Sequence, residues 1–410
     1  MRHLSTMNDA GQCNAVEFKL RQQPRYLWQL PSGQSELLVE TLLPTLVNAG
    51  LRSGACVVEK LGGGAHSRIY KVDYRGIAAN AYCVKIPDFG SVGSYNEAGQ
   101  VLNSIAHEVE KTSQLWASPF IHMFSRIDNL LRWPVLVSAW RYGTLKDYIL
   151  VRQGVDDFDR VFAILQIVWA LQFAKRRGIS PHQDLKPENI LVEDIGLGKF
   201  ADYQGSGIKL HCRVADFALA NGYRELGRPF GSRPYQAPEQ YSGIAPIFDA
   251  EKIDVFALGV IMFELFEEGM HPIGQITEDV WPENLEKPAS TQNKWKREDR
   301  WKKWAQQNDK TLPAARTALG NDFSDFIVKM ISGDPVTRPS LDSVELKLLM
   351  YLSERWPERT KEAVLQADFW TSESENFEDP AGFPPLVKDL LVQVEHLRAA
   401  AQYLQEFKDE

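Results

Sequence analysis

The chain has 410 residues, of which 44% are hydrophobic and 24% are charged, and its net charge is -8 at pH 7. This length predicts two or three globular units, and the negative charge argues against a general nucleic-acid binder. No apolar run reaches the roughly 18 residues that a membrane helix needs, and the four cysteines show no metal-type spacing. We therefore expect a reduced, cytoplasmic protein without a membrane span.

The first part of the chain predicts strands after an N-terminal extension of residues 1–54. Within the extension, residues 35–50 predict an amphipathic helix that Pro44 bends or ends. From Cys56 onwards, short β-branched or aromatic runs separated by Gly or Asn predict three consecutive strands, namely CVVEKL, SRIYKVDY and AYCVKI. Residues 105–116 (IAHEVEKTSQLW) predict a helix, and PVLVSAW predicts a buried strand.

The second part of the chain is helical in character. Residues 156–178 begin with acidic residues and end with basic residues and Gly, as the helix dipole and a C-cap favour. The apolar run VFALGVIMFELF predicts a second core helix. A strand-rich part followed by a helix-rich part predicts an α+β fold with two lobes.

Several segments depart from this plan. Residues 193–209 are Gly-rich and predict an inserted loop or hairpin. The Lys-, Arg- and Trp-rich segment within residues 276–320 could contact nucleic acid or a partner, but we favour an exposed helix anchored by Trp295, Trp301 and Trp304. Residues 372–385 predict an acidic linker. The helical stretch that follows is either a docking or dimer element or a solvated cap on the helical lobe.

The octapeptide HQDLKPEN, residues 182–189, resembles the catalytic loop H-R-D-L-K-P-E-N of eukaryotic-type Ser/Thr protein kinases. The resemblance covers residues 56–350 and implies a bilobal fold. The strand-rich N-lobe would comprise residues 55–140 and the larger helical C-lobe residues 141–350, followed by a linker and C-terminal helix in 351–410. It also implies ATP and Mg²⁺ as cofactors, with Mn²⁺ as an alternative metal, and a protein substrate.

Two motifs of the first part are similar to the nucleotide-binding motifs of that family. LGGGAHSRIYKV resembles the Gly-rich loop, with Ser67 in place of the third glycine, and CVKIP resembles the strand motif V-A-I-K. The resemblance implies that Lys85 binds the α- and β-phosphates and that the nucleotide contacts include Leu61, Gly62, Gly63, Gly64, Ile69, Cys83, Ala139 and Trp140. Ser138 is either the gatekeeper beside an open back pocket or an ordinary strand serine.

The partner that the family provides for Lys85 is a helix glutamate. Glu108 fits best, because Leu115 then occupies the position of a leucine in the family's helix, and Glu110 and Glu97 are alternatives. This assignment requires residues 88–95 (DFGSVGSY) to form an enlarged loop. The DFG within that loop precedes the catalytic loop, so we do not take it as the metal motif.

The transfer chemistry is assigned to the second part of the chain. By the resemblance, Asp184 accepts the proton of the substrate hydroxyl, and Lys186 neutralises charge on the transferred phosphate. Asn189 and Asp216 offer the hard oxygen ligands that Mg²⁺ prefers. Asp216 belongs to VADFALA, which is similar to D-F-G with Ala218 for Gly. We expect Ala218 to disfavour flipping of Asp216 out of the site.

The remaining motifs follow in the family's order. GSRPYQAPEQY resembles the end of an activation segment, with Ser232 and Tyr235 in its P+1 region. KIDVFALG resembles the helix that anchors the larger lobe through Asp254 and Gly259. In SGDPVTRPS, the resemblance pairs Arg338 with Glu239, and His182 packs beneath the metal motif.

Gln183 is the most informative departure, because the family places there an Arg that pairs with a phosphate on the activation segment. The activation segment itself, DFALANGYRELGRPFG, offers few sites for such a phosphate, since it contains no Ser or Thr and only Tyr223 carries a hydroxyl. We therefore expect activity without an activating phosphate. Lys186 favours Ser/Thr over Tyr specificity. A pseudokinase scaffold and a small-molecule phosphotransferase of kinase-like fold remain the alternatives.

Overall fold

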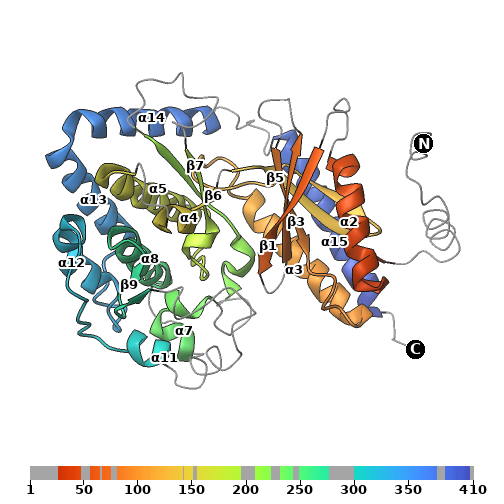
Figure 1. The fold of residues 1–410 in the computed structure, drawn as a ribbon, viewed down its shortest axis with the longest axis horizontal. Coiled ribbons are helices and arrows are strands. Elements are labelled where there is room, and N and C mark those ends of the chain that lie inside the picture. Colours follow the sequence, from red (N-terminus) through yellow and green to blue (C-terminus); the bar gives the residue numbers. More distant parts are fainter. Residues whose placement is uncertain are drawn as a thin grey trace, which may run out of the picture. The chain divides into compact units, whose positions relative to one another are not determined.

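The computed structural model describes residues 26–47, 56–64, 67–74, 81–141, 143–150, 155–194, 208–222, 231–242, 249–276, 300–375 and 384–406. The chain divides into two compact units. Unit 1 draws on residues 1–106, 124–140 and 392–410, and unit 2 on residues 107–123 and 141–391. Figure 1 shows the strands and helices of each unit. In the part of the chain that is described, no helix is both long enough and apolar enough to cross a membrane.

Unit 1 is built on an antiparallel sheet with strand order β1-β2-β3-β5-β4. Its strands are β1 (Cys56–Gly64), β2 (Ser67–Tyr74), β3 (Ala81–Pro87), β4 (Arg126–Leu130) and β5 (Trp133–Ala139). The three strands predicted from Cys56 onwards and the buried strand β5 are confirmed. β4 was not predicted, because its sequence RIDNL is mostly polar and lies at the edge of the sheet.

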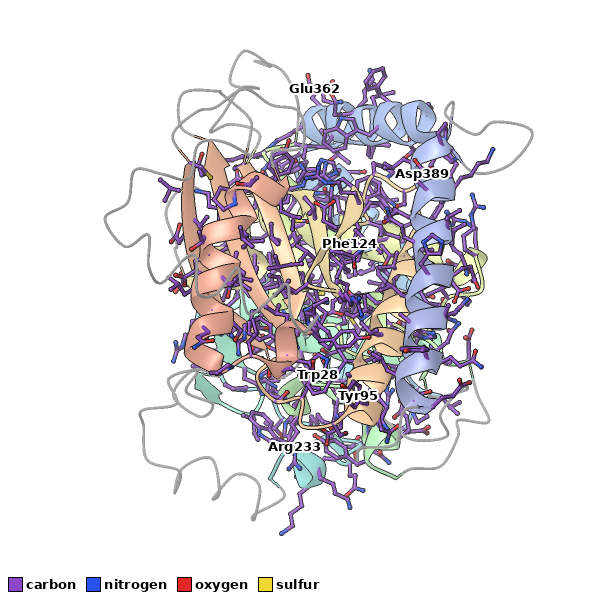
Figure 2. The ribbon with its side chains drawn as sticks, turned by 90° about the vertical axis from the view of Figure 1, so that its right-hand side faces the viewer. Trp28, Tyr95, Phe124, Arg233, Glu362 and Asp389 are labelled. Atoms are coloured by element: carbon purple, nitrogen blue, oxygen red, sulfur yellow. The ribbon has the colours of Figure 1, made fainter. Side chains whose placement is uncertain are left out.

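Two short N-terminal elements cover part of this sheet. The 3-10 turn η1 (Leu27–Gln29) bonds to the β4–β5 turn through the Leu27 amide, and Trp28 packs edge-on against Tyr95 (Figure 2). The helix α2 (Ser32–Val47) packs on β1, β2 and β4. Pro44 lies inside α2 and does not end it. The carbonyl that loses its helical partner belongs to the exposed Glu40, so water can satisfy it.

The helix α3 (Tyr95–Ser113) begins ten residues before the predicted start at Ile105. The hydroxyl oxygen of Ser94 accepts a hydrogen bond from the Glu97 amide at 3.1 Å, and the Glu97 carboxylate accepts one from the Gly93 amide at 2.7 Å. These bonds form an N-terminal cap. The enlarged loop expected at residues 88–95 is therefore shorter, because its last residue already belongs to the helix.

The C-terminal helix α15 (Pro385–Glu406) packs against α3 within unit 1. A Cβ atom on Gly99 would lie 2.8 Å from the Ala401 carbonyl oxygen, so only glycine permits this approach. At the sheet edge, the Gln393 side chain accepts a hydrogen bond from the Ile127 amide of β4 at 3.0 Å. The predicted helix is confirmed, and its residues 392–406 belong to unit 1, so this part is not a cap on the helical lobe; a docking or dimer contact with a partner stays a prediction.

Unit 2 is mainly helical. Its helices are α4 (Leu145–Leu150), α5 (Asp157–Arg176), α7 (Pro238–Ser242), α8 (Glu251–Phe266), α11 (Arg300–Ala305), α12 (Ala318–Met330), α13 (Leu341–Arg355) and α14 (Pro357–Glu375). The predicted core helices are confirmed as α5 and α8, which are buried along most of their length. The α+β prediction is therefore correct.

Short elements of unit 2 carry the candidate site. They are the 3-10 turns η2 (Pro187–Asn189), η3 (Phe217–Leu219) and η4 (Arg233–Tyr235), the sheet β6 (Gly143–Thr144), β7 (Ile190–Asp194) and β8 (Leu210–Val214), and the hairpin β9 (Met270–His271) and β10 (Gln275–Ile276). Of the inserted loop expected at residues 193–209, residues 195–207 lie outside the described residues. Its first two residues belong to β7, which ends at Asp194, and β8 begins after it at Leu210.

In unit 2, the structure differs from the sequence prediction at α14 and agrees with it at α11. The helix α14 was not predicted, and the first residues of the expected acidic linker, 372–375, are helical. Arg359 of α14 explains its position, since it bonds to Asp156 at 2.6 Å and to Asp159 at the start of α5. Trp301 and Trp304 are buried anchors of α11, as expected, whereas Trp295 lies outside the described residues.

Candidate active site

Asp184 lies at the centre of a hydrogen-bonded group in unit 2. One carboxylate oxygen, Oδ2, accepts from the Lys186 ammonium at 2.8 Å, and the other, Oδ1, accepts from the Ser232 amide at 2.7 Å. Lys186 also donates to the Ser232 hydroxyl at 2.9 Å. The catalytic loop and the end of the activation segment therefore hold the candidate base in one orientation.

Lys186 keeps its charge in this setting. Its burial alone would lower the pKa of the ammonium, but the carboxylates of Asp184, Glu188 and Asp216 outweigh burial and raise that pKa above its usual value. A lysine that stays protonated is a fixed positive charge beside the candidate base. Such a charge suits an anionic group that approaches Asp184.

Asn189 is oriented by the same loop. Its amide nitrogen donates to the Asp184 backbone carbonyl at 2.9 Å, so the side-chain oxygen points the other way. The Asn189 backbone carbonyl accepts from the Ala215 amide at 2.8 Å, which ties η2 to the residue before Asp216. An amide oxygen and a carboxylate are thereby supplied from two adjoining segments.

Asp216 adopts a left-handed backbone conformation, with φ 64° and ψ 66°. The segment around it is fixed by His182, whose Nε2 donates to the Ala215 carbonyl at 3.0 Å and whose ring lies 4.7 Å from the buried ring of Phe217. His182 thus packs beneath this motif, as expected. Ala218 follows within η3, a position that its side chain tolerates.

Asn189 and Asp216 fit a magnesium ion by the chemistry of their oxygen donors. Mg²⁺ is usually held by one or two carboxylates together with substrate phosphates and water, and not by a complete protein cage. The described residues contain no cluster of three or more His, Cys, Asp and Glu side chains suited to a metal. A bound Mg²⁺ would therefore take its remaining ligands from a phosphate substrate and water.

Gln183 takes a role that the sequence did not indicate. Its side-chain nitrogen donates to the Leu219 carbonyl of η3 at 2.6 Å, and its side chain is only 4% exposed. Its own carbonyl accepts from the Gln240 side chain at 3.0 Å, and its amide donates to Asp254 at 3.1 Å. A neutral amide therefore connects the catalytic loop directly to the segment that follows Asp216.

Gly231 makes the close approach of the activation segment possible. It has φ 128°, and a Cβ atom there would lie 2.5 Å from the Gln183 carbonyl oxygen. The neighbouring Ser232 could not reach Asp184 if Gly231 carried a side chain. The sequence motif included this glycine but did not indicate its close approach to the Gln183 carbonyl.

Two supporting interactions inferred from the resemblance are confirmed. Asp254 of α8 accepts from the His182 amide at 2.8 Å, so the core helix holds the catalytic loop by its backbone. Arg338 and Glu239 form a bidentate ion pair with distances of 2.7 and 2.9 Å, and the Arg338 side chain is fully buried. The first interaction holds the catalytic loop, and the second joins α7 to α8, because Arg338 also donates to the Lys252 carbonyl at 2.8 Å.

The predicted nucleotide-binding residues of the Gly-rich segment lie on β1 and β2 of unit 1. Gly62, Gly63 and Gly64 are the last residues of β1, and the register shifts next to Leu61, which is exposed. Ile69 of β2 pairs with both Gly62 and Lys85 of β3. The sheet thus places an apolar side chain between a glycine-rich strand end and a lysine.

The other predicted nucleotide contacts lie on β3 and at the end of β5. Cys83 pairs with Ser138, and Tyr82 pairs with Ala139. The Trp140 amide donates to the Ala81 carbonyl at 3.1 Å. Ser138 is buried and donates weakly to the Cys83 carbonyl at 3.5 Å. Burial raises the pKa of the Cys83 thiol to about 11, so this thiol is protonated at neutral pH.

Burial separates the three candidate glutamates of α3. Glu108 is 2% exposed, whereas Glu110 is half-buried and Glu97 is exposed and occupied with the helix cap. A carboxylate is rarely buried so completely unless a cation or hydrogen-bond donor accompanies it. The burial supports Glu108 as the functional glutamate. Leu115 is also buried but lies just beyond the end of the helix.

Comparison with known proteins gives the family. A family described as "Protein kinase domain" matches residues 56–348. Three similar relatives are serine/threonine-protein kinase chk1 of Schizosaccharomyces pombe, MAP kinase-interacting serine/threonine-protein kinase 1 of Xenopus tropicalis and carbon catabolite-derepressing protein kinase of Secale cereale.

The similarity to these relatives is partial. Identity to the S. pombe protein is 31% over 189 residues, which is 46% of this chain and 35% of the relative. For the X. tropicalis protein it is 28% over 190 residues, 44% of this chain and 42% of the relative. For the S. cereale protein it is 31% over 134 residues, 32% of this chain and 23% of the relative. Each match spans less than half of the relative's length.

Proposed function

Because the chain belongs to the protein kinase family, we propose that it is an ATP- and Mg²⁺-dependent kinase that phosphorylates Ser or Thr hydroxyls of protein substrates. The observation that carries the proposal is the position of Asp184, whose carboxylate is held between the Lys186 ammonium and the Ser232 amide. A carboxylate fixed in this way can accept a proton from an approaching hydroxyl.

The roles of the other residues follow from their chemistry. Lys186 stabilises negative charge on the transferred phosphoryl group, since its ammonium remains charged beside Asp184. Asn189 and Asp216 would hold Mg²⁺, which supplies charge neutralisation on the phosphates. Lys85 binds the α- and β-phosphates, and Glu108 orients that lysine. Leu61, Gly62, Gly63, Gly64, Ile69, Cys83, Ala139 and Trp140 contact the nucleotide.

We further propose that the activation segment needs no phosphate. The charged pair between an Arg and a phosphorylated hydroxyl is replaced by the neutral bond from Gln183 to the Leu219 carbonyl. This bond is present in the chain as it stands, and it does not depend on a modification. Tyr223, the one hydroxyl-bearing residue of residues 216–231, lies outside the described residues.

The test is transfer of label from ATP to a generic protein substrate with Mg²⁺ or Mn²⁺. The wild-type chain is expected to label Ser and Thr, and Asp184→Ala is expected to lose most of this activity, by about 10²- to 10⁴-fold for a general base. Absence of labelling with either metal would favour a pseudokinase scaffold. Labelling of a small molecule but never of a protein would favour the phosphotransferase alternative.

A further inference from the structure

Arg233 occupies a position next to the candidate base that the proposed chemistry does not use. It directly follows Ser232, whose amide bonds to Asp184 at 2.7 Å and whose hydroxyl bonds to Lys186 at 2.9 Å. Successive Cα atoms are about 3.8 Å apart. The Arg233 Cα atom therefore lies one residue away from Ser232, the residue that contacts Asp184.

The backbone of Arg233 is held by a hydrogen bond. The Arg233 carbonyl accepts from the Tyr241 hydroxyl at 2.8 Å. Two residues further on, the buried Tyr235 donates to the Glu264 carboxylate at 2.9 Å. The Arg233 side chain itself is half-buried and has no ion-pair partner among the described residues.

The helix α11, which contacts η4, carries two more cations. α11 packs against η4 and α7, and its Trp301 is buried against Tyr241 and Ile273. Figure 2 shows Arg233 next to α11, which is drawn in cyan. Lys302 and Lys303 follow Trp301 directly, and neither has an ion-pair partner within the described part of the chain.

The carboxylates around this region are already engaged. Glu188 pairs with Lys146 at 3.3 Å, Glu239 pairs with Arg338, and Glu264 accepts from Tyr235. The positive charge of Arg233, Lys302 and Lys303 is therefore not balanced by these neighbours, in a chain whose net charge is -8. Among the described residues, cations without an ion-pair partner near the candidate base can attract an anionic partner.

We propose that Arg233, with Lys302 and Lys303, selects protein substrates that carry an acidic side chain within two positions of the phosphorylated residue. Arg presents a planar fork of donors that matches a carboxylate, so Arg233 provides most of the discrimination. The inference rests on the proposed kinase activity. It also favours an acidic peptide over nucleic acid, since the two described tryptophans of α11 are buried and cannot stack on bases.

The experiment uses the full chain and synthetic peptides with one Ser acceptor and either Asp or Asn at each position from two before to two after it. The expected result is a kcat/KM about two- to fivefold higher for one or more Asp peptides, as a charge-assisted pair on a half-exposed surface gives. Arg233→Gln should abolish the preference, and Lys302→Gln with Lys303→Gln should reduce it. Lys329→Gln, which removes an exposed lysine of α12, is the matched control and should keep it.

Charge reversal distinguishes a lost contact from misfolding. Arg233→Glu should gain a preference for peptides with Lys at the same position, whereas a misfolded variant could only lose activity. Equal kcat/KM for Asp and Asn peptides, or a preference that survives in Arg233→Gln, would overturn the inference. Binding of the same peptides, measured by fluorescence polarisation, tests this inference separately from the proposed kinase activity. Asp-selective binding without phosphorylation would support the proposed acidic-substrate surface and refute the proposed kinase activity. Tighter, Arg233-dependent binding of a single-stranded oligonucleotide would overturn the inference in favour of nucleic acid.

Discussion

Replacement of Gln183 by Leu tests the neutral link between the catalytic loop and the segment after Asp216. Leu keeps a similar volume and is unbranched at Cβ, so the left-handed backbone at this position, with φ 71°, is disturbed little. The substitution removes the donor to the Leu219 carbonyl, a bond of 2.6 Å at a side chain that is 4% exposed. The Leu side chain would fill the buried space of the Gln183 amide and keep water from this carbonyl, and a carbonyl left without a donor in that way costs about 1–3 kcal/mol.

This cost should appear as easier local opening of residues 215–222. Since 1.4 kcal/mol corresponds to a factor of ten, the expected increase in amide hydrogen exchange for this segment is about 5- to 150-fold. Hydrogen-exchange mass spectrometry of a peptide that covers these residues measures the change. We expect kcat/KM to fall with it, because Asp216 lies in the same segment.

Gln236→Leu is the matched control. The Gln236 side chain donates to the Gly231 carbonyl at 2.7 Å, but both residues are half-buried, so water can replace the lost donor. Its effect on exchange should stay below about fivefold. If Gln183→Leu changed exchange no more than this control, the proposed bracing role of Gln183 would be wrong.

Three further predictions concern other contacts. Arg338→Leu or Glu239→Leu alone should cost about 3–5 kcal/mol in urea unfolding, because each leaves a buried charge unpaired, whereas the double variant should cost less than either. Gly99→Leu should cost about 1–3 kcal/mol by overpacking against Ala401 and should speed proteolysis within residues 384–406; unchanged cleavage would show that α15 does not need this contact. Burial lowers the pKa of His271 to about 3, so the unfolded chain binds more protons between about pH 3 and 6.5 and stability falls as pH drops through that window. From pH 7 to 5 this amounts to about 2 kcal/mol, and His271→Gln should remove that part of the loss in urea unfolding.

Residues whose roles depend on local pattern were predictable from the sequence. The strands around Lys85 show short β-branched runs bounded by Gly and Asn, and the core helices α5 and α8 are apolar over most of their length. The pair between Arg338 and Glu239 was found because two motifs far apart in the chain could be matched to one family.

Elements that depend on contacts distant in sequence were not predictable. β4 is polar and is recognised as a strand only through its pairing with β5. α14 lacks a clear apolar stripe, and Arg359 positions it through a bond to Asp156, about two hundred residues away in sequence. The early start of α3 was missed for a different reason: its cap at Ser94 is local, but the preceding DFG-like sequence led us to assign this region to a loop.

The sequence indicated only one part of the role of Gln183. The sequence showed that a phosphate could not be paired at this position, which is a statement about an interaction that is lost. The bond to the Leu219 carbonyl that replaces it runs between a side chain and a backbone atom. Backbone acceptors carry no residue-type signal, so no motif could have indicated this bond.

The most direct test of the central claim is the activity of the full-length chain after complete dephosphorylation, verified by intact mass. We expect transfer of label from ATP to Ser or Thr of a protein substrate at a rate unchanged by the phosphatase treatment, and loss of that transfer in Asp184→Ala. Activity that disappears on dephosphorylation and returns only when a residue between 217 and 231 is phosphorylated again would contradict it.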